Sequence, residues 1–418
     1  MMLSNRLFNR ALLKNSSLPM RRLKLHEYQA GALLNKFEVP IPVGNVAFSA
    51  EEAQQIASGI SGGCVVKSQV LGGGRGLGHI KETGFQGGVH LVDNADQAKS
   101  VASEMLGKTL VTHQSGANGL PVNAVYLVQK LAIQKEMYLS LTLDRAAGCP
   151  TFIYSPAGGM SIEDVAEKTP ELIFKLPVHP VNGLDQAELR QAATNLGIGE
   201  QADQVANMFT KIYECFMQKD CDMVEINPLV LTKDKKVLAA DSKVTIDSNA
   251  AFRQRDLADQ EDKTQDDPRE QIAKKFELNY IHIGGNIGCL VNGAGLAMST
   301  MDIIKLYGGE PANFLDVGGS AEGDQLTEAL KLLNDDPEVE AIFVNIFGGI
   351  LRCDNLAASI IRANKENSFD KPMVLRLKGT NSDIAKQMIA GKERELNIFY
   401  NEDFDSAAQQ VCQVVNKQ

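Results

Sequence analysis

Lys67 stands out because it is a cation inside an apolar stretch. It lies in Cys64-Val65-Val66-Lys67-Ser68-Gln69-Val70, a pattern typical of a β-strand, and a glycine cluster, Gly72-Gly73-Gly74-Arg75-Gly76, follows. A buried ammonium is costly unless it meets an anion. Glycines let backbone N–H groups approach a phosphate closely. The stretch is neither a Walker A motif nor a G-x-G-x-x-G motif. It therefore predicts either a phosphate site or a glycine-rich hairpin without function.

Oxygen-bearing side chains form a second constellation, Glu225-x-Asn227-Pro228 with Asp241-x-Lys243. Two neighbouring strands joined by a tight turn would bring Asn227 and Asp241 side by side. One amide oxygen and one carboxylate suit Mg²⁺, which takes a few protein oxygens together with substrate phosphates. A solvated hairpin that carries ordinary surface charges explains the same pattern.

Glycine-rich turns form a third constellation in the second half of the chain. They are Asn292-Gly293-Ala294-Gly295, Gly318-Gly319-Ser320 and Gly348-Gly349-Ile350, and each follows a short apolar run. Such turns could bind a phosphate, a carboxylate or the pantetheine arm of a cofactor at helix N-termini. They could equally be the tight turns that any doubly wound sheet requires.

The two halves of the chain differ in the elements that must position these residues. The first half shows strand-like runs with hairpins and a few helices, so we expect a mixed α+β domain. In the second half, helix-length segments separate short buried-type strands. The expected strands are 287–291, 313–317, 341–346, 373–377 and 398–400. This alternation predicts an open parallel sheet with helices on both faces and ligands beyond the carboxyl ends of the strands.

A charge-rich, apolar-poor segment, 253–269, separates the halves and is the expected connection. The predicted organisation is a leader at 1–22, one domain at 23–262 and a second at 263–418. A chain of 418 residues suits two domains, because single cores stop growing near ~250–300 residues.

Composition excludes several classes of function. A net charge of −10 argues against nucleic acid as a principal ligand. The sequence has no apolar run of about 18 residues, so we expect no membrane span. The seven cysteines are odd in number and scattered, which favours free, mostly buried thiols in a reducing compartment.

The first 22 residues are basic and amphipathic. They contain five Lys or Arg residues interspersed with leucines, and no Asp or Glu. Such a leader is typical of a mitochondrial transit peptide, although a basic tail without function fits as well.

Several longer stretches resemble one family, the β subunits of succinate–CoA ligases. They occur in the family's order from Leu25 to the C-terminus. The stretches are LHEYQ (25–29), Lys67 with GGGRG (72–76), EINPL (225–229), FRQ (252–254), NIGC (286–289), VNGAGLAM (291–298), GGEPANFLDVGG (308–319) and VNIFGGI (344–350). The resemblance implies an ATP-grasp domain followed by a flavodoxin-like CoA-ligase domain.

The resemblance also implies roles for residues of the first half. Carried over by position, Lys67 and Gly74-Arg75-Gly76 would contact the nucleotide phosphates, and Glu136 would contact the ribose. Asn227 and Asp241 would hold Mg²⁺.

Two further roles concern the partner subunit and the substrate. Glu225 would stand close to an incoming phosphohistidine, which in this family belongs to the α subunit. The carboxylate substrate would bind at the subunit junction, at Asn292 and Gly349-Ile350-Leu351.

The implied reaction consumes ATP or GTP, succinate and CoA and forms succinyl-CoA through succinyl phosphate, as in the tricarboxylic acid cycle of mitochondria or related organelles. An α subunit would be an obligate partner and would bind most of the CoA. Rival hypotheses are a ligase for another dicarboxylate such as malate, a GTP-specific form, and a catalytically silent nucleotide-binding partner.

Some positions depart from the family pattern, and one bears on nucleotide choice. Leu77 stands where relatives usually have lysine, Gln129 lies where the adenine hinge usually has glutamate, and Gly284 replaces an aspartate. Pro42 occupies a position where ATP-using members have proline and GTP-specific members have glutamine. Because proline offers guanine neither a side-chain donor nor a backbone N–H, we expect a preference for ATP.

The leader hypothesis can be tested directly. Residues 1–22 fused to a fluorescent reporter should enter mitochondria or a related organelle, because a basic amphipathic leader is what the import machinery recognises. Microscopy of the fusion provides the measurement, and a variant with its five cations changed to glutamine is the matched control. A diffuse cytosolic signal from the unaltered leader would favour the tail without function.

Overall fold

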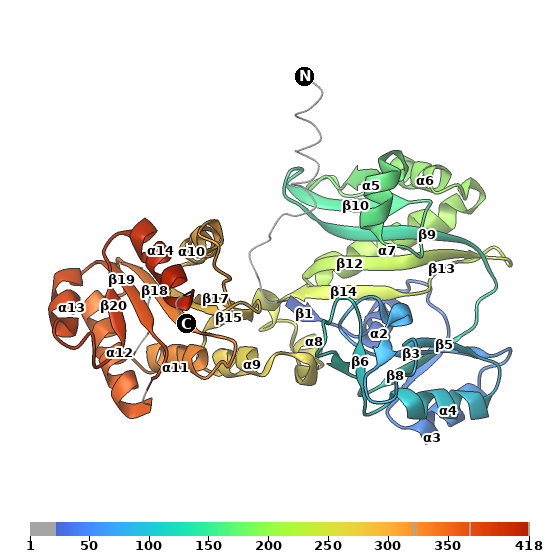
Figure 1. Cartoon of the computed structure of the whole chain (residues 1–418). Helices are drawn as coiled ribbons and strands as arrows, with labels where there is room; N and C mark the ends of the chain where they lie inside the picture. Colours follow the sequence, from blue (N-terminus) through green and yellow to red (C-terminus); the bar gives the residue numbers. More distant parts are fainter. Residues whose placement is uncertain (1–21, 320, 322, 368, 417–418) are drawn as a thin grey trace. The chain divides into compact units, whose positions relative to one another are not determined.

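The computed structural model describes residues 22–319, 321, 323–367 and 369–416 (Figure 1). The described chain forms two compact units, one ending at Gln265 and the other beginning at Asp266. Apart from Arg22, which begins the first strand, the predicted leader lies outside the described residues, as does Ser320.

A seven-stranded antiparallel sheet dominates the first unit, with strand order β1-β14-β12-β9-β10-β11 and β13 paired to β12. Alternate side chains of β9 face the core, where Phe152 and Phe209 pack with ring centroids 4.6 Å apart. Helices α6 (Gln186–Asn195) and α7 (Ala202–Gln218) supply the other half of this core. The strands are β1 (Arg22–Lys24), β9 (Ile133–Asp144), β10 (Cys149–Ser155), β11 (Phe174–Pro177), β12 (Cys221–Thr232), β13 (Val237–Ala239) and β14 (Ser242–Asp247).

A four-stranded sheet of order β2-β8-β3-β5 forms the other part of this unit. Figure 1 shows α3 (Ala50–Ser58) and α4 (Ala95–Met105) side by side along it, and their buried alanines pack on the sheet. The strands are β2 (Gly44–Ala47), β3 (Cys64–Ser68), β5 (Val89–Val92) and β8 (Val125–Gln129). A three-stranded sheet of β4 (His79–Ile80), β6 (Thr109–Val111) and β7 (Leu120–Pro121) lies in the same unit.

A side-chain cap begins α3 of this unit. Ser49 accepts the N–H of Glu52 at the start of α3, which is one half of a capping box. The glutamate carboxylate accepts from the N–H of Phe48, one residue before the cap. The remaining helices are α2 (Glu27–Lys36), η1 (Arg75–Leu77), α5 (Ile162–Lys168), η2 (Pro170–Leu172), η3 (Gly199–Gln201), η4 (Ser248–Ala250), α8 (Arg255–Ala258) and η5 (Lys263–Gln265).

The second unit contains a six-stranded sheet of order β15-β17-β16-β18-β19-β20. Strands β16 to β20 are parallel to their neighbours, as predicted, but the edge strand β15 pairs antiparallel with β17. Its short run of mixed polarity hid it from the sequence pattern. The strands are β15 (Asn279–His282), β16 (Ile287–Val291), β17 (Asn313–Asp316), β18 (Ala341–Gly348), β19 (Met373–Gly379) and β20 (Ile398–Tyr400).

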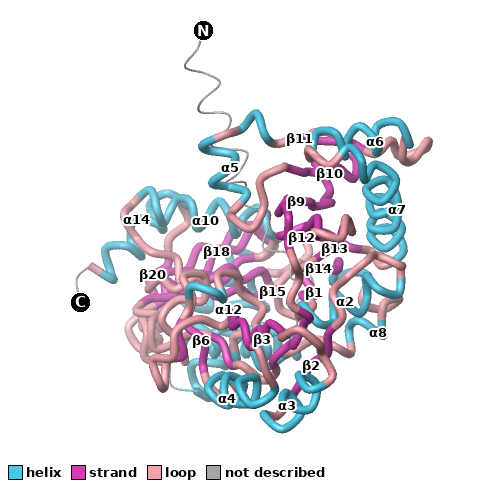
Figure 2. Tube along the Cα trace, turned by 90° about the vertical axis from the view of Figure 1, so that its right-hand side faces the viewer, coloured by secondary structure: helices cyan, strands magenta, loops and turns pink. Residues whose placement is uncertain are grey.

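Helices cover both faces of this parallel sheet, which explains its continuous apolar strands. One face packs against α10 (Ala294–Leu306) and α14 (Phe404–Val415), and the other against α11 (Gly323–Asn334), α12 (Cys353–Asn367) and α13 (Ser382–Ile389). Figure 2, turned by 90°, labels α10, α12 and α14 together with β15, β18 and β20 of this unit. Helix α9 (Pro268–Lys275) begins the unit, and Arg269 there pairs with the buried Asp336.

The segment predicted as a connection is more ordered than its composition suggests. It contains α8 and η5, and Gln265 binds the first unit by donating to the carbonyls of Gln69 and Pro121. All seven cysteines are buried, as predicted. Among the described residues, none of the helices is both long enough and apolar enough to cross a membrane.

Candidate functional site

One face of the seven-stranded sheet packs on the core, and the other carries polar side chains. Glu225 on β12 lies opposite Ser140 of β9 and Lys243 of β14. Because side chains alternate along a strand, these polar residues share one face, while Val224 and Ile226 point into the core. The backbone N–H of Asn227 donates to the carbonyl of Asp241 at 3.2 Å. The predicted juxtaposition of these two residues is therefore confirmed.

Asn227 lies at a bulge, where the register of β12 against β9 shifts by one residue. Its Oδ1 accepts the N–H of Gly159 at 2.8 Å, and its Nδ2 donates to the carbonyl of Met160 at 2.9 Å. Gly159 has a φ of +73°, in the left-handed region that favours glycine, and a Cβ on it would lie 2.1 Å from Oε2 of Glu136. The turn at 158–160 thus brings Glu136 and Asn227 to the same place on the sheet.

Four charged side chains form a continuous chain of ion pairs beside this face. Lys67 Nζ lies 2.6 Å from Glu27 Oε1 and donates to the carbonyl of Ala240 at 3.1 Å. Arg75 lies between two carboxylates, with Nη1 2.8 Å from Glu27 Oε2 and Nη2 2.7 Å from Asp241 Oδ2. The anion that the buried Lys67 requires is therefore, in this structure, a carboxylate of the chain itself.

The two carboxylates of this chain have opposite pKa shifts. Burial works to raise the pKa of Glu27, but Lys67 and Arg75 outweigh it and hold the pKa below its usual range. Burial and the nearby charge of Glu27 raise the pKa of Asp241, against the opposing pull of Arg75. The ionised form of Asp241 is therefore disfavoured, whereas that of Glu27 is favoured. A bound cation would stabilise ionised Asp241.

The glycine cluster after β3 forms a turn that ends in η1. The N–H of Gly73 donates to Gln114 Oε1 at 2.8 Å, and Gly76 has open space around its Cα. Leu77, which replaces the usual lysine, exposes 97% of its surface. Arg75 and Lys67 are thus the cations that this stretch directs toward the polar face.

The two positions expected to bear on nucleotide choice lie close together. Pro42 is buried just before β2, and the N–H of Gln129, at the end of β8, donates to the carbonyl of the next residue, Val43, at 2.8 Å. The Gln129 side chain is exposed. The structure therefore brings together the proline and the altered hinge.

In the second unit, the glycine-rich turns follow adjacent parallel strands and meet at one edge of the sheet. Asp316 Oδ1 accepts the N–H groups of Gly293 at 2.6 Å and Gly318 at 2.8 Å, tying two of the turns together. The carboxamide of Asn292 exchanges two hydrogen bonds with the backbone of Phe347. The predicted substrate residue Asn292 is thus fixed at the end of β18.

The other predicted substrate residues differ in exposure. Ile350 exposes 83% of its surface, whereas Leu351 exposes 4% and could meet a ligand only through its backbone. Gly349 lies between them and the end of β18, and its carbonyl accepts the hydroxyl of Thr380.

Sequence reasoning missed three charged residues near these places. Glu27 was visible only as part of the stretch LHEYQ, and Asp316 as part of a turn. Arg376 is a cation inside the apolar run of β19, the same signal that singled out Lys67, and it donates to Asn345 Oδ1 at 3.2 Å.

The two protein oxygens at the polar face are too few for a metal held by protein ligands alone, but they suit Mg²⁺ that is also bound by substrate phosphates. Asn227 and Asp241 offer an amide and a carboxylate oxygen, and substrate phosphates would complete an octahedral shell. No group of three or more His, Cys, Asp or Glu side chains among the described residues is arranged to hold a metal. A metal bound to Oδ2 of Asp241 and Oδ1 of Asn227 would compete with Arg75 and with the N–H of Gly159 for these oxygens.

Comparison with known proteins identifies both units. The model of the ATP-grasp domain matches residues 24–231, and that of the CoA-ligase domain matches 290–412. The "Succinate--CoA ligase [ADP-forming] subunit beta" of Paracoccus denitrificans is 47% identical over 94% of this chain and 100% of its own length. The chain belongs to the family of succinate–CoA ligase β subunits. The predicted ATP-grasp and CoA-ligase folds are thereby confirmed.

Other succinate–CoA ligase β subunits show the same extent of similarity. The mitochondrial ADP-forming protein of Solanum lycopersicum is 46% identical over 95% of both chains, and that of Dictyostelium discoideum is 47% identical over 94% of this chain and 88% of its own. Among solved structures, an ATP citrate lyase from Methanothrix soehngenii shares the fold, with a TM-score of 0.69 at 14% identity over 95% of this chain and 100% of its own.

The raised pKa of Asp241 generates a test of stability. Asp241→Asn should raise the free energy of unfolding at neutral pH, because the ionised carboxyl, not the neutral form, carries the cost of burial. The difference in free energy of unfolding between the variant and the parent should appear as the pH rises above about 4, the pKa of the carboxyl in the unfolded chain. It should reach its full size above the pKa in the folded chain.

Urea unfolding of the first unit across a pH series provides the measurement. Asp203→Asn, on an exposed carboxylate paired with Arg190, is the matched control and should change stability little at any pH. A loss of stability in Asp241→Asn that grows with pH would contradict the assignment.

Proposed function

We propose that this chain is the β subunit of a succinate–CoA ligase that uses ATP and works with an α subunit. The observation that carries the proposal is the full-length similarity to ADP-forming β subunits, joined to one place where Lys67, Arg75, Asn227 and Asp241 come together. The reaction would join succinate and CoA at the expense of ATP, releasing ADP and phosphate.

The first unit would bind the nucleotide and transfer its terminal phosphoryl group. Lys67, Arg75 and the N–H groups of the glycine turn, Gly74 to Gly76, would bind the phosphates. Glu136 would hold the ribose. Phosphoryl transfer depends mostly on positioning and on neutralising charge, and Lys67 on β3 and Arg75 in η1, whose side chains are largely buried, suit that task. Bound Mg²⁺, held by Asn227 and Asp241, would supply further charge neutralisation at the phosphates.

The phosphoryl group would be accepted by a histidine of the α subunit. Glu225 lies on the polar face two residues before Asn227 in β12, where it could orient that imidazole. Burial and Glu225 together raise the pKa of the neighbouring Tyr138, which keeps its hydroxyl protonated.

The second unit would receive the carboxylate substrate. The backbone of Gly349, Ile350 and Leu351 and the fixed amide of Asn292 lie at the carboxyl edge of the parallel sheet, where ligands of such sheets bind. The exposed Phe347 and Ile350 beside them suit a junction with the α subunit, which would bind most of the CoA.

For localisation we propose the mitochondrion or a related organelle. The support is the basic, acid-free leader; mitochondrial relatives from a plant and from Dictyostelium are similar to this chain as well. Bacterial relatives are equally similar, so the leader alone carries this proposal.

Reconstitution tests the function. The chain purified with its α subunit should form succinyl-CoA from succinate, CoA and ATP, while the chain by itself should show no turnover, because the family's phosphohistidine motif is absent from it. Faster turnover with malate than with succinate would identify the rival ligase for another dicarboxylate. Binding of ATP without any turnover would identify a catalytically silent subunit. Turnover by the rigorously purified single chain would refute the need for an α subunit.

Nucleotide choice forms a separate test. In the reconstituted enzyme, kcat/KM should favour ATP over GTP by about tenfold to a hundredfold, since unpaired polar groups of guanine cost roughly 1–3 kcal/mol each. Pro42→Gln should narrow the ratio by about tenfold by adding an amide. Pro42→Ala, which adds no donor, is the control. Equal use of both nucleotides by the parent would show that Pro42 does not set the preference.

A further inference from the structure

Glu27 is the first residue of α2, and it is the carboxylate on which the cationic part of the site depends. Its residue surface is 8% exposed, and each of its oxygens contacts a different cation, Lys67 at 2.6 Å and Arg75 at 2.8 Å. Two cations held this close together would repel each other without the carboxylate between them. The helix N-terminus adds a favourable field for a negative charge.

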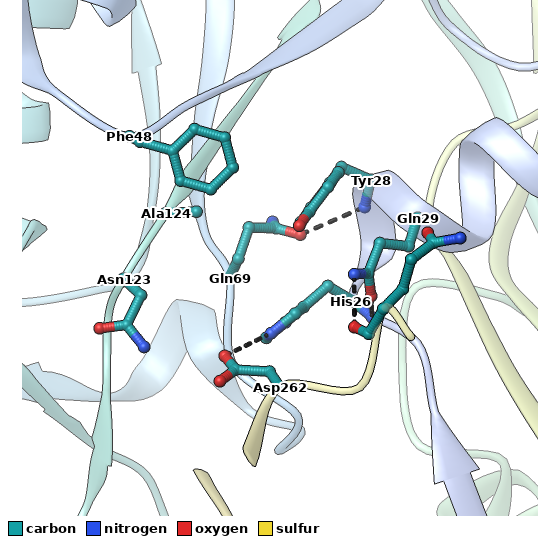
Figure 3. Close-up of a pocket in the computed structure, with 9 residues that line it drawn as sticks. His26, Tyr28, Gln29, Phe48, Gln69, Asn123, Ala124 and Asp262 are labelled. Carbon is teal, nitrogen blue, oxygen red and sulfur yellow. Dashed lines mark hydrogen bonds and ion pairs between the residues drawn. The ribbon is translucent and has the colours of Figure 1, made fainter. Parts of the chain in front are cut away.

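The first turn of α2 is fixed from two sides, so Glu27 cannot shift freely. Figure 3 shows His26 directed at Asp262, with Nε2 and Oδ2 2.9 Å apart, and the N–H of Tyr28 donating to Gln69 Oε1. Gln29 accepts the N–H of His26 and donates to the carbonyl of Gln260. The residues that make these contacts line a cavity of about 200 Å³, and their polar groups hold the first turn of α2 in place.

Arg75 is shared between two carboxylates that differ in what else they can bind. Nη1 binds Glu27, which is buried inside the unit, whereas Nη2 binds Asp241, whose side chain is 31% exposed on the polar face. A metal that bound Oδ2 of Asp241 would remove one partner of Arg75. Losing the only partner of a buried charge is strongly unfavourable, but Arg75 would keep Glu27.

We infer that Glu27 is a positioning residue that anchors Lys67 and Arg75, so that Arg75 can exchange Asp241 for a nucleotide phosphate when Mg²⁺ binds. The exchange would keep every charge paired: Asp241 would hold the metal, Nη2 of Arg75 would bind the phosphate, and Glu27 would hold Nη1 throughout. The inference rests on the proposed nucleotide site, and it adds a direct coupling between metal and nucleotide.

The test measures ADP binding to the reconstituted complex by calorimetry, with Mg²⁺ and with the metal removed by a chelator. In the parent, Mg²⁺ should tighten ADP binding. In Glu27→Gln, Arg75 has Asp241 as its one remaining carboxylate and should release it less readily. The enhancement by Mg²⁺ should therefore fall by about tenfold or more, equivalent to 1.4 kcal/mol per decade.

Two further variants make the result specific. Glu27→Asp keeps the charge and should recover part of the enhancement, and it carries the test if Glu27→Gln does not fold. Glu51→Gln, on an exposed glutamate paired with Lys99, is the matched control and should leave binding unchanged. A purely structural role would weaken ADP binding equally with and without Mg²⁺.

An unchanged enhancement of ADP binding by Mg²⁺ in folded Glu27→Gln would overturn the inference. Tighter binding of ADP by this variant would also overturn it, because it would show that Glu27 competes with phosphate for the two cations. Because ADP binding does not require turnover, this outcome is separate from failure of the proposed function. A parent complex that binds no ADP would refute the nucleotide site itself.

Discussion

The pairing of Lys67 and Arg75 with Glu27 and Asp241 is the interaction on which the first unit's site depends. A cation is useful to a phosphate only if it is partly shielded from water, and such shielding is costly for an unpaired charge. Internal carboxylates remove that cost in the absence of a ligand. A phosphate that binds Lys67 or Arg75 must compete with the same carboxylates. The affinity for nucleotide and its dependence on metal therefore arise from one set of contacts.

The second unit uses the same device with backbone groups. The turns after β16 and β17 offer N–H groups that would suit an anion, and Asp316 accepts two of them. In both units a carboxylate of the chain satisfies donors at the edge of a sheet. The difference lies in mobility: Asp316 is held among turns at a strand end, whereas Asp241 is exposed enough to change partners.

Sheet geometry explains how residues far apart in sequence reach these places. An antiparallel register fixes Asn227 against Asp241, and the bulge in β12 redirects the amide toward the turn at 158–160. The register follows from the core face, because a slip of one residue would turn Val224 and Ile226 outward. Packing on one face thus determines the chemistry on the other.

Local periodicity in the sequence determined the parallel sheet of the second unit, and a short hairpin determined the neighbouring positions of Asn227 and Asp241, whereas the ATP-grasp fold of the first unit was expected from the resemblance to the ligase family. Tertiary structure alone decided the partners of the charges. Glu27 lies 40 residues from Lys67, and no local pattern specifies such a pairing. The hydrogen bonds of Gln265 to Gln69 and Pro121 were not predicted for the same reason, and β15 was not predicted because its four residues are too short and too mixed in polarity to show a strand pattern. Where burial forces a charge to find a partner, only the folded chain shows which one it finds.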